Sequence, residues 1–220
     1  MVRDQVIIGD GMIGRAMADV HGLRGTVVYA AGVSNSACVD EREFNRERQR
    51  LTEALQFPGL FIYFSTCSEE DRPYTHHKRA MEGLVKARGS YLIARLSIVA
   101  GKTPNPHTLL NFLYSRVARS ERFTLRTLAR RNVIDVRDVA RVVDELVRAG
   151  TENETVNVAA PEDYGIREIV REFERICRKP AIVDCVDEGD APLIDTRRIA
   201  DTVVDFSGDY LARTLRRYYA

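Results

Sequence analysis

The chain has 220 residues, 45% of them hydrophobic, which is enough for one large domain or for a domain with a small lobe. Its 33 lysines and arginines balance 32 aspartates and glutamates, and this balance gives no indication of a nucleic-acid or membrane surface. No apolar signal segment or membrane-length run is visible, and the four cysteines lack metal-ligand spacing. We therefore expect a cytoplasmic protein with reduced thiols and no bound metal.

Along the chain, apolar segments alternate between the periods of strands and helices, which favours an α/β fold with a mostly parallel sheet. Strands are expected near residues 4–8, 26–30, 60–64, 90–96, 155–159 and 181–186. Helices are expected near residues 12–21, 40–55, 74–88, 109–117, 137–149, 166–177, 196–203 and 207–219. Charged helix faces, such as the one over residues 40–50, are expected to be solvated.

A glycine-rich turn follows the first expected strand directly. Residues 9–14 read Gly-Asp-Gly-Met-Ile-Gly, which is the GxGxxG spacing of a dinucleotide-binding turn in its strand–turn–helix context. Gly9 permits the tight turn, Gly11 lets a pyrophosphate approach the backbone, and Gly14 lets the helix pack closely on the strand.

The residues that open the following helix complete the predicted phosphate site. Met12 and Ile13 would present backbone N–H groups, and the positive end of the helix dipole, to the phosphates. Arg15 is a further candidate because a guanidinium pairs well with a 2′-phosphate and would favour NADP. The alternative for Arg15 is a solvated helix residue.

A second constellation joins Thr66, Tyr74 and Lys78. Tyr74 and Lys78 are four residues apart and share one helix face. A phenol has a pKa of about 10, but one positive charge about 4 Å away is worth roughly 4 kcal/mol at an effective dielectric of about 20. This would bring the phenol into the range of acid/base catalysis. The Thr66 hydroxyl could then orient a substrate alcohol or carbonyl.

Taken together, these segments resemble the extended short-chain dehydrogenases/reductases of the NAD-dependent epimerase/dehydratase family, nucleotide-sugar type. Tyr74 and Lys78 match the family's YxxxK pair, and residues 61–66 resemble the strand that delivers the catalytic Ser/Thr, here Thr66. Four more segments are similar to family segments in the same order: 27–32 with the cofactor-lining Ala31 and Gly32, 94–101 with Leu96 and Ile98 beside the nicotinamide, 131–140 with Arg131, and 155–159.

The resemblance implies a Rossmann-like, doubly wound parallel sheet in one compact unit. Residues 1–100 and 127–160 would form the nucleotide-binding core, and residues 101–126 and 161–220 a small substrate-side lobe. The implied function is NAD(P)-dependent epimerisation, dehydration or reduction of an activated sugar, in surface polysaccharide or related sugar biosynthesis. Tyr74 would be the acid/base, Lys78 would lower its pKa and bind the nicotinamide ribose, and Thr66 would hold the reacting oxygen. A homodimer is implied by analogy only.

The chain departs from the family in its adenosine-binding half. The interval between Gly14 and Ala31 has room for one helix and one strand, whereas the family has two further strands there. No acidic residue ends the strand at Val28-Tyr29 to bind the ribose diol. The cofactor is therefore NAD or NADP bound through the pyrophosphate turn, or bound with help from a partner subunit, or no dinucleotide binds.

The substrate side departs as well. Arg131 matches an arginine that clamps the diphosphate of the nucleotide-sugar, as bidentate pairing permits. The family's second arginine is replaced by Asp187 or Glu188, and Asp135 replaces a histidine. A smaller or differently activated sugar is therefore plausible.

Two other functional readings stay open. The fold could serve a non-catalytic binding or regulatory protein that has lost dinucleotide-dependent chemistry, or a redox sensor that binds NADP to regulate a partner. His76 and His77 point to other helix faces and favour surface or packing roles. Cys67 follows Thr66, but no general base at a motif-defined position supports it as a nucleophile.

Overall fold

The computed structural model describes residues 5–20, 22–23 and 25–220. Its centre is a parallel sheet in the order β1-β2-β3-β4-β8. The strands are β1 (Val6–Ile8), β2 (Thr26–Tyr29), β3 (Leu60–Thr66), β4 (Tyr91–Leu96) and β8 (Glu154–Val158). The predicted Rossmann-like α/β fold is thereby confirmed. Asp4, which was expected to begin the first strand, and His21, at the end of the first expected helix, lie outside the described residues.

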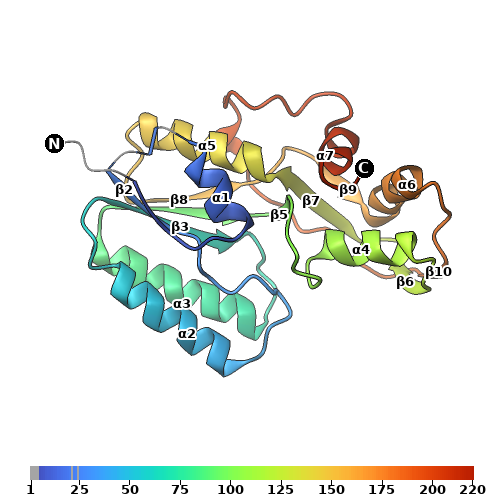
Figure 1. Ribbon diagram of the computed structural model, residues 1–220, viewed down its shortest axis with the longest axis horizontal. Helices are drawn as coiled ribbons and strands as arrows, with labels where there is room; N and C mark the ends of the chain where they lie inside the picture. The colour runs from blue at the N-terminus through green and yellow to red at the C-terminus, as the bar shows by residue number, and fades with distance from the viewer. Residues whose placement is uncertain (1–4, 21, 24) are drawn as a thin grey trace.

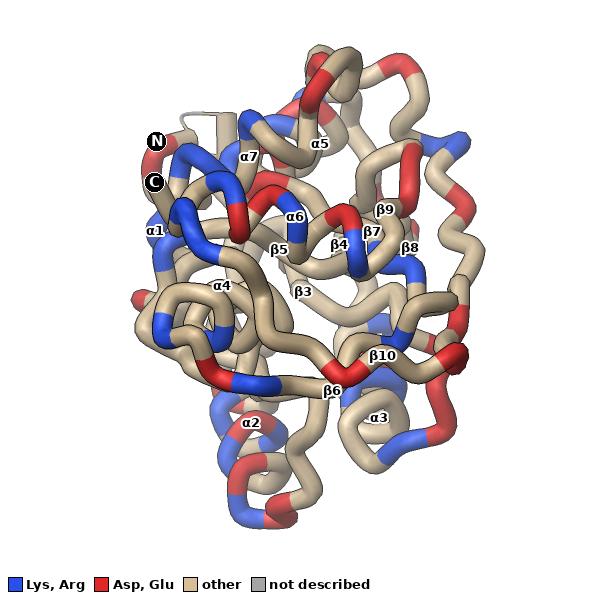
Figure 2. The backbone as a smooth tube through the Cα atoms, turned by 90° about the vertical axis from the view of Figure 1, so that its right-hand side faces the viewer, with Lys and Arg blue, Asp and Glu red and all other residues tan. Residues whose placement is uncertain are grey.

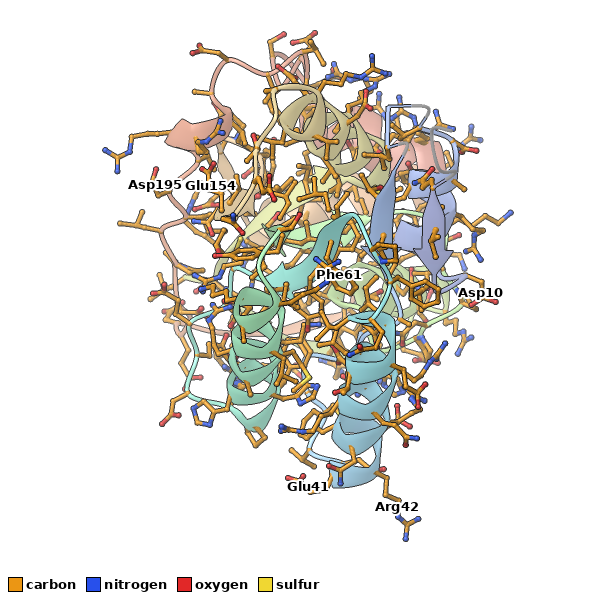
Figure 3. The ribbon with its side chains drawn as sticks, turned by 90° about the vertical axis from the view of Figure 1, so that its left-hand side faces the viewer. Asp10, Glu41, Arg42, Phe61, Glu154 and Asp195 are labelled. Atoms are coloured by element: carbon orange, nitrogen blue, oxygen red, sulfur yellow. The ribbon has the colours of Figure 1, made fainter. Side chains whose placement is uncertain are left out.

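Helices cover both faces of the sheet (Figure 1). On one face α1 (Met12–Ala18) lies beside α5 (Val136–Arg148), and their apolar side chains share a core with β2, β3, β4 and β8. On the other face α2 (Glu41–Ala54) and α3 (Pro73–Arg88) form a second apolar core with β2 and β3. Figure 3 shows these two helices side by side beneath the sheet.

Among the described residues, no strand extends the sheet beyond β1. Within the described residues β1 pairs with β2 alone and is an edge strand, as the short interval between Gly14 and Ala31 predicts. The steps β1→β2→β3 advance in one direction, yet α1 and α2 lie on opposite faces of the sheet. Two crossovers of the same hand would place both helices on one face, so one of the two is left-handed, a form found in only about 2% of such units.

A second group of elements packs beside the carboxyl ends of the central strands. It contains a small sheet of β5 (Ile98–Ala100), β7 (Arg130–Asp135) and β9 (Asp163–Gly165), and a parallel pair of β6 (Phe123–Arg126) with β10 (Val183–Val186). The helices α4 (Leu109–Ala118), α6 (Ile166–Cys177) and α7 (Tyr210–Tyr219) share an apolar core with these strands.

The strands β5, β6, β7 and β9 are additions to the expected elements. The helix expected over residues 196–203 is wrong, because only the 3-10 turn η1 (Arg197–Ile199) forms there. The β-branched run from Thr202 to Val204 disfavours helix, and Val203 is 73% exposed, so packing does not compensate. The proposed boundaries between core and lobe stay a prediction.

Positively and negatively charged residues are interspersed along the chain (Figure 2). None of the helices that the structure describes combines the length and apolar composition needed to cross a membrane.

The close packing of the glycine turn can be tested with two substitutions. A Cβ on Gly14 would lie 2.1 Å from the carbonyl oxygen of Gly9, whereas a Cβ on Gly83 in α3 meets no atom within 4 Å. We expect Gly14→Ala to destabilise the fold by about 1–3 kcal/mol through overpacking. Gly83→Ala should stabilise it by about 0.5–1 kcal/mol by favouring the helix. Urea denaturation measures both, and equal stability of the two variants would contradict this packing.

Candidate active site

A cavity of about 1060 Å³ opens where β1, β2, β3 and β4 end. Its wall includes most of the predicted site residues: Gly9, Gly11, Met12, Ile13, Ala31, Gly32, Thr66, Tyr74, Lys78, Leu96, Ile98 and Arg131. The carboxyl ends of parallel strands and the loops that follow them meet at one edge of a sheet, which is where such folds bind ligands. Residues far apart in the sequence therefore face one space.

The three glycines of the turn have different surroundings. Gly9 has a φ of 113°, and a Cβ there would lie 2.5 Å from the carbonyl oxygen of Ala30. Gly14 is buried against Gly9 and does not line the cavity. A Cβ on Gly11, by contrast, would meet no heavy atom within 4 Å, so this backbone borders open space in the cavity wall.

Arg15 is held by backbone carbonyls. Its guanidinium donates to the oxygens of Asp10 at 2.7 Å and Lys102 at 3.3 Å, so it links the loop after β1 to the loop after β5. It is not among the described residues that line the cavity. This geometry favours a structural role over recognition of a 2′-phosphate.

Thr66 ends β3 at the cavity wall. Its Oγ1 accepts a hydrogen bond from the Ser68 N–H at 3.1 Å. Arg79 donates to the carbonyl oxygens of Thr66 and Ser68, both at 3.0 Å. Arg79 is itself paired with the buried Glu82 at 2.6 Å, and Glu82 also receives two hydrogen bonds from Arg95. This network, absent from the sequence-based prediction, fixes the turn that carries Thr66.

Tyr74 and Lys78 lie on α3 and both reach the cavity, as their spacing predicts. Burial raises the pKa of the Tyr74 phenol above its usual range, the negative charge of Glu47 adds to this increase, and Arg79 opposes it. The expectation that Lys78 lowers the Tyr74 pKa is therefore wrong for the free protein. The physical reason is first the burial of the phenol and second the Glu47 carboxylate, which contacts Lys78 and adds to the increase.

That carboxylate belongs to Glu47 of α2, whose side chain is fully buried. Its oxygens accept hydrogen bonds from Val33 N at 2.7 Å, Tyr63 OH at 2.8 Å, His77 Nε2 at 3.0 Å and Lys78 Nζ at 3.1 Å. Burial alone would raise the pKa of this carboxyl, but Lys78 and the hydrogen bonds outweigh it and lower the pKa to about 2.

The two histidines beside Tyr74 have different roles. His76 is exposed and lies 2.7 Å from Asp71. His77 is buried, stacks on Phe44 with ring centroids 4.5 Å apart, and bonds Glu47. The expected packing role of His77 thus includes a polar contact with the Glu47 carboxylate. The expectation that the charged face over residues 40–50 is solvated holds for most of its charged residues but is wrong for Glu47, which is buried.

On the substrate side, Arg131 lies at the cavity wall but has an anionic partner. Its guanidinium donates to the Asp190 carboxylate at 2.9 Å. Asp135 is fully buried away from the cavity, where it accepts hydrogen bonds from Arg217 and Tyr218 and so ties α7 to β7. The replacement of the family's histidine by Asp135 therefore serves the fold of the lobe, and it gives no information on the substrate.

Among the described residues there is no group of three or more histidine, cysteine, aspartate or glutamate side chains that could hold a metal ion.

Comparisons with known proteins agree with this architecture. Residues 58–159 match the model of the NAD dependent epimerase/dehydratase family. This match confirms the family resemblance predicted from the sequence. It covers β3 with Thr66, the Tyr74/Lys78 helix and the segment that begins with Arg131. No curated protein matches the sequence.

Solved structures show the same fold at low sequence identity. RMD from Pseudomonas aeruginosa, complexed with NADPH, superposes with a TM-score of 0.77 at 17% identity, over 98% of this chain and 96% of that chain. UDP-glucose 4-epimerase from Thermotoga maritima, with UDP-glucose, superposes with a TM-score of 0.74 at 16% identity, over 97% of this chain and 96% of that chain. WbmH from Bordetella bronchiseptica, in complex with NAD+, superposes with a TM-score of 0.76 at 15% identity, over 100% of this chain and 97% of that chain.

The cysteine beside Thr66 is a poor nucleophile in this site, which gives a direct test. Burial raises the pKa of the Cys67 thiol to about 12, so about one thiol in ten thousand is ionised at pH 8. We expect iodoacetamide at pH 8 to alkylate the exposed Cys185 far faster than Cys67, as followed by peptide mass spectrometry. Equal labelling rates at both positions would show that Cys67 is accessible and ionisable.

Proposed function

We propose that the protein is an NAD(P)-dependent enzyme that epimerises, dehydrates or reduces a nucleotide-linked sugar. The observation that carries this proposal is that the glycine turn and the set Thr66, Tyr74 and Lys78 line one cavity. A turn that favours phosphate groups and a phenol–ammonium–hydroxyl set that can move a proton are of little use to a pure scaffold. The NADPH, NAD+ and UDP-glucose named for the similar structures support the same cofactor and substrate classes.

The residues present fit the nicotinamide half of a dinucleotide. Gly11 leaves backbone open to the cavity beside Met12 and Ile13, where a pyrophosphate would lie. Ala31, Gly32, Leu96 and Ile98 would border the remainder of that half. The adenosine half fits less closely, because β1 is an edge strand and β2 ends at Tyr29 without an acidic residue for the ribose diol. When bound, the nicotinamide would supply or accept hydride.

The protein's own residues would handle the proton. The raised pKa of Tyr74 keeps its phenol protonated at neutral pH in the free protein. Tyr74 is thus ready to donate a proton to a sugar carbonyl oxygen, which corresponds to the reductive step of the proposed chemistry. Thr66 would donate a hydrogen bond to the same oxygen, and Lys78 would bind the nicotinamide ribose.

Arg131 is the proposed contact for the substrate's phosphate groups. Because Asp190 already pairs with it, a diphosphate would have to replace that carboxylate at the guanidinium. The competition with Asp190 supports the smaller or differently activated sugar that the sequence leaves open.

The proposal is tested by Tyr74→Phe, with Tyr114→Phe as control. Removal of the Tyr74 hydroxyl removes the proton donor, so turnover of a panel of nucleotide sugars should fall about 10²–10⁴-fold. The affinity for NADPH or NADH, followed by nicotinamide fluorescence, should be retained. Tyr114 lies in α4 outside the cavity wall, and its variant should behave as wild type. Unchanged turnover in Tyr74→Phe would refute the proposed role of Tyr74.

A further inference from the structure

The buried carboxylate of Glu47 lies directly behind the cavity wall. Lys78 and Tyr74 belong to that wall, whereas Glu47 is not among the described residues that line it. Glu47 can therefore affect a bound ligand only through the groups it holds. Of these, Lys78 is the one that reaches the cavity with a positive charge.

The Glu47–Lys78 pair is closely packed on the sides that face Gly32 and Tyr63. A Cβ on Gly32 would lie 2.7 Å from Glu47 Oε1 and 2.8 Å from Lys78 Nζ, so the pair fills the space that a side chain there would need. On the sheet side, Lys78 Nζ lies 4.6 Å from the centre of the Tyr63 ring. The ammonium is thus confined between backbone, ring and carboxylate.

Glu47 is the acidic group in direct contact with Lys78. The other titratable groups around the pair are Tyr63 from β3, Tyr29 from β2, and His77, Tyr74 and Glu82 from α3. Glu82 is itself paired with Arg79 and Arg95. Burial lowers the pKa of Lys78, and Glu47 opposes this, so without Glu47 the ammonium would lose its main stabilising charge.

We propose that Glu47 is a positioning residue that holds the charged Lys78 ammonium at the cavity wall for its contact with a bound dinucleotide. This inference rests on the proposed function. It explains why a full buried ion pair is present between α2 and α3. Such pairs are weak contributors to stability, and apolar replacements are often neutral or stabilising. The two helices already share an apolar core that includes Leu51 and Met81.

The test uses Glu47→Gln, which keeps the size of the side chain and removes its charge. The matched control is Glu43→Gln on the same helix, because Glu43 is partly exposed and pairs with Arg46. The chain has only four lysines, so the ¹³Cε signals of Lys78, Lys86, Lys102 and Lys179 can be followed by NMR as pH is raised, with Lys78→Met giving the assignment.

We expect the Lys78 titration in Glu47→Gln to move to lower pH by at least about one unit, and that in Glu43→Gln to match wild type. An unchanged Lys78 titration in folded Glu47→Gln would overturn the inference. If Glu47→Gln does not fold, Glu47→Asp replaces it. That variant keeps the charge but shortens its reach, so Lys78 should stay protonated while NADPH affinity falls. Wild-type affinity in Glu47→Asp would overturn the positioning role.

A second readout separates this inference from the proposed function. In wild type, NADPH affinity measured by fluorescence should be nearly constant from pH 6 to 9, and in Glu47→Gln it should fall about tenfold as Lys78 loses its proton. A purely structural role would change the stability of the variant without this pH dependence. Absence of NADPH and NADH binding to wild type would overturn the proposed function, and with it this role of Glu47. An unchanged Lys78 titration overturns the role of Glu47 alone.

Discussion

The Glu47–Lys78 ion pair is the interaction on which the geometry of the candidate site depends. It joins α2 to α3 and, through Val33 and Tyr63, ties both helices to the loop after β2 and to β3. A carboxylate buried this deeply needs several donors to offset its loss of hydration. These donors come from the loop after β2, from β3 and from α3, so the Glu47 carboxylate fixes these three elements relative to one another. Lys78 is thereby placed at the cavity wall without being free to activate Tyr74 by its charge alone.

The shortened sheet imposes the second constraint. With β1 at the edge, the chain retains the carboxyl ends of the strands that carry the glycine turn, Gly32, Thr66 and the Tyr74 helix. The part that would surround adenosine is reduced to what α1 and β1 provide. Helices α1 and α2 lie on opposite faces of the sheet. This arrangement is expected if a larger sheet loses the strands between these two helices, because each helix then stays on the face that it covered in the larger sheet. Within the described residues, the proposed catalytic residues are thus retained, whereas no strand extends the sheet beyond β1 on the side expected to bind adenosine.

Sequence patterns predicted the central sheet and its helices well because the apolar residues of each strand and helix recur with a clear period. In addition, the glycine turn marks the end of the first strand and the beginning of the first helix. They failed where the deciding contact lies between distant segments. Glu47 appears in a highly charged helix, yet it falls in line with Phe44, Leu51 and Ala54, the positions that face the core. That alignment was the available signal. The raised pKa of Tyr74 could not be predicted from its spacing to Lys78, since it depends first on burial and then on the Glu47 carboxylate, which comes from another helix. The short lobe strands such as β6 depend on partners as distant as β10.

The most direct test is a crystal structure of the protein with NADPH. It should show the pyrophosphate against the backbone at Gly11 and the nicotinamide ribose within hydrogen-bond distance of Lys78, while Lys78 Nζ still contacts Glu47. The nicotinamide should lie close to Tyr74 and Thr66. A dinucleotide bound away from this cavity, or a Lys78 side chain that leaves Glu47 to reach it, would contradict the account.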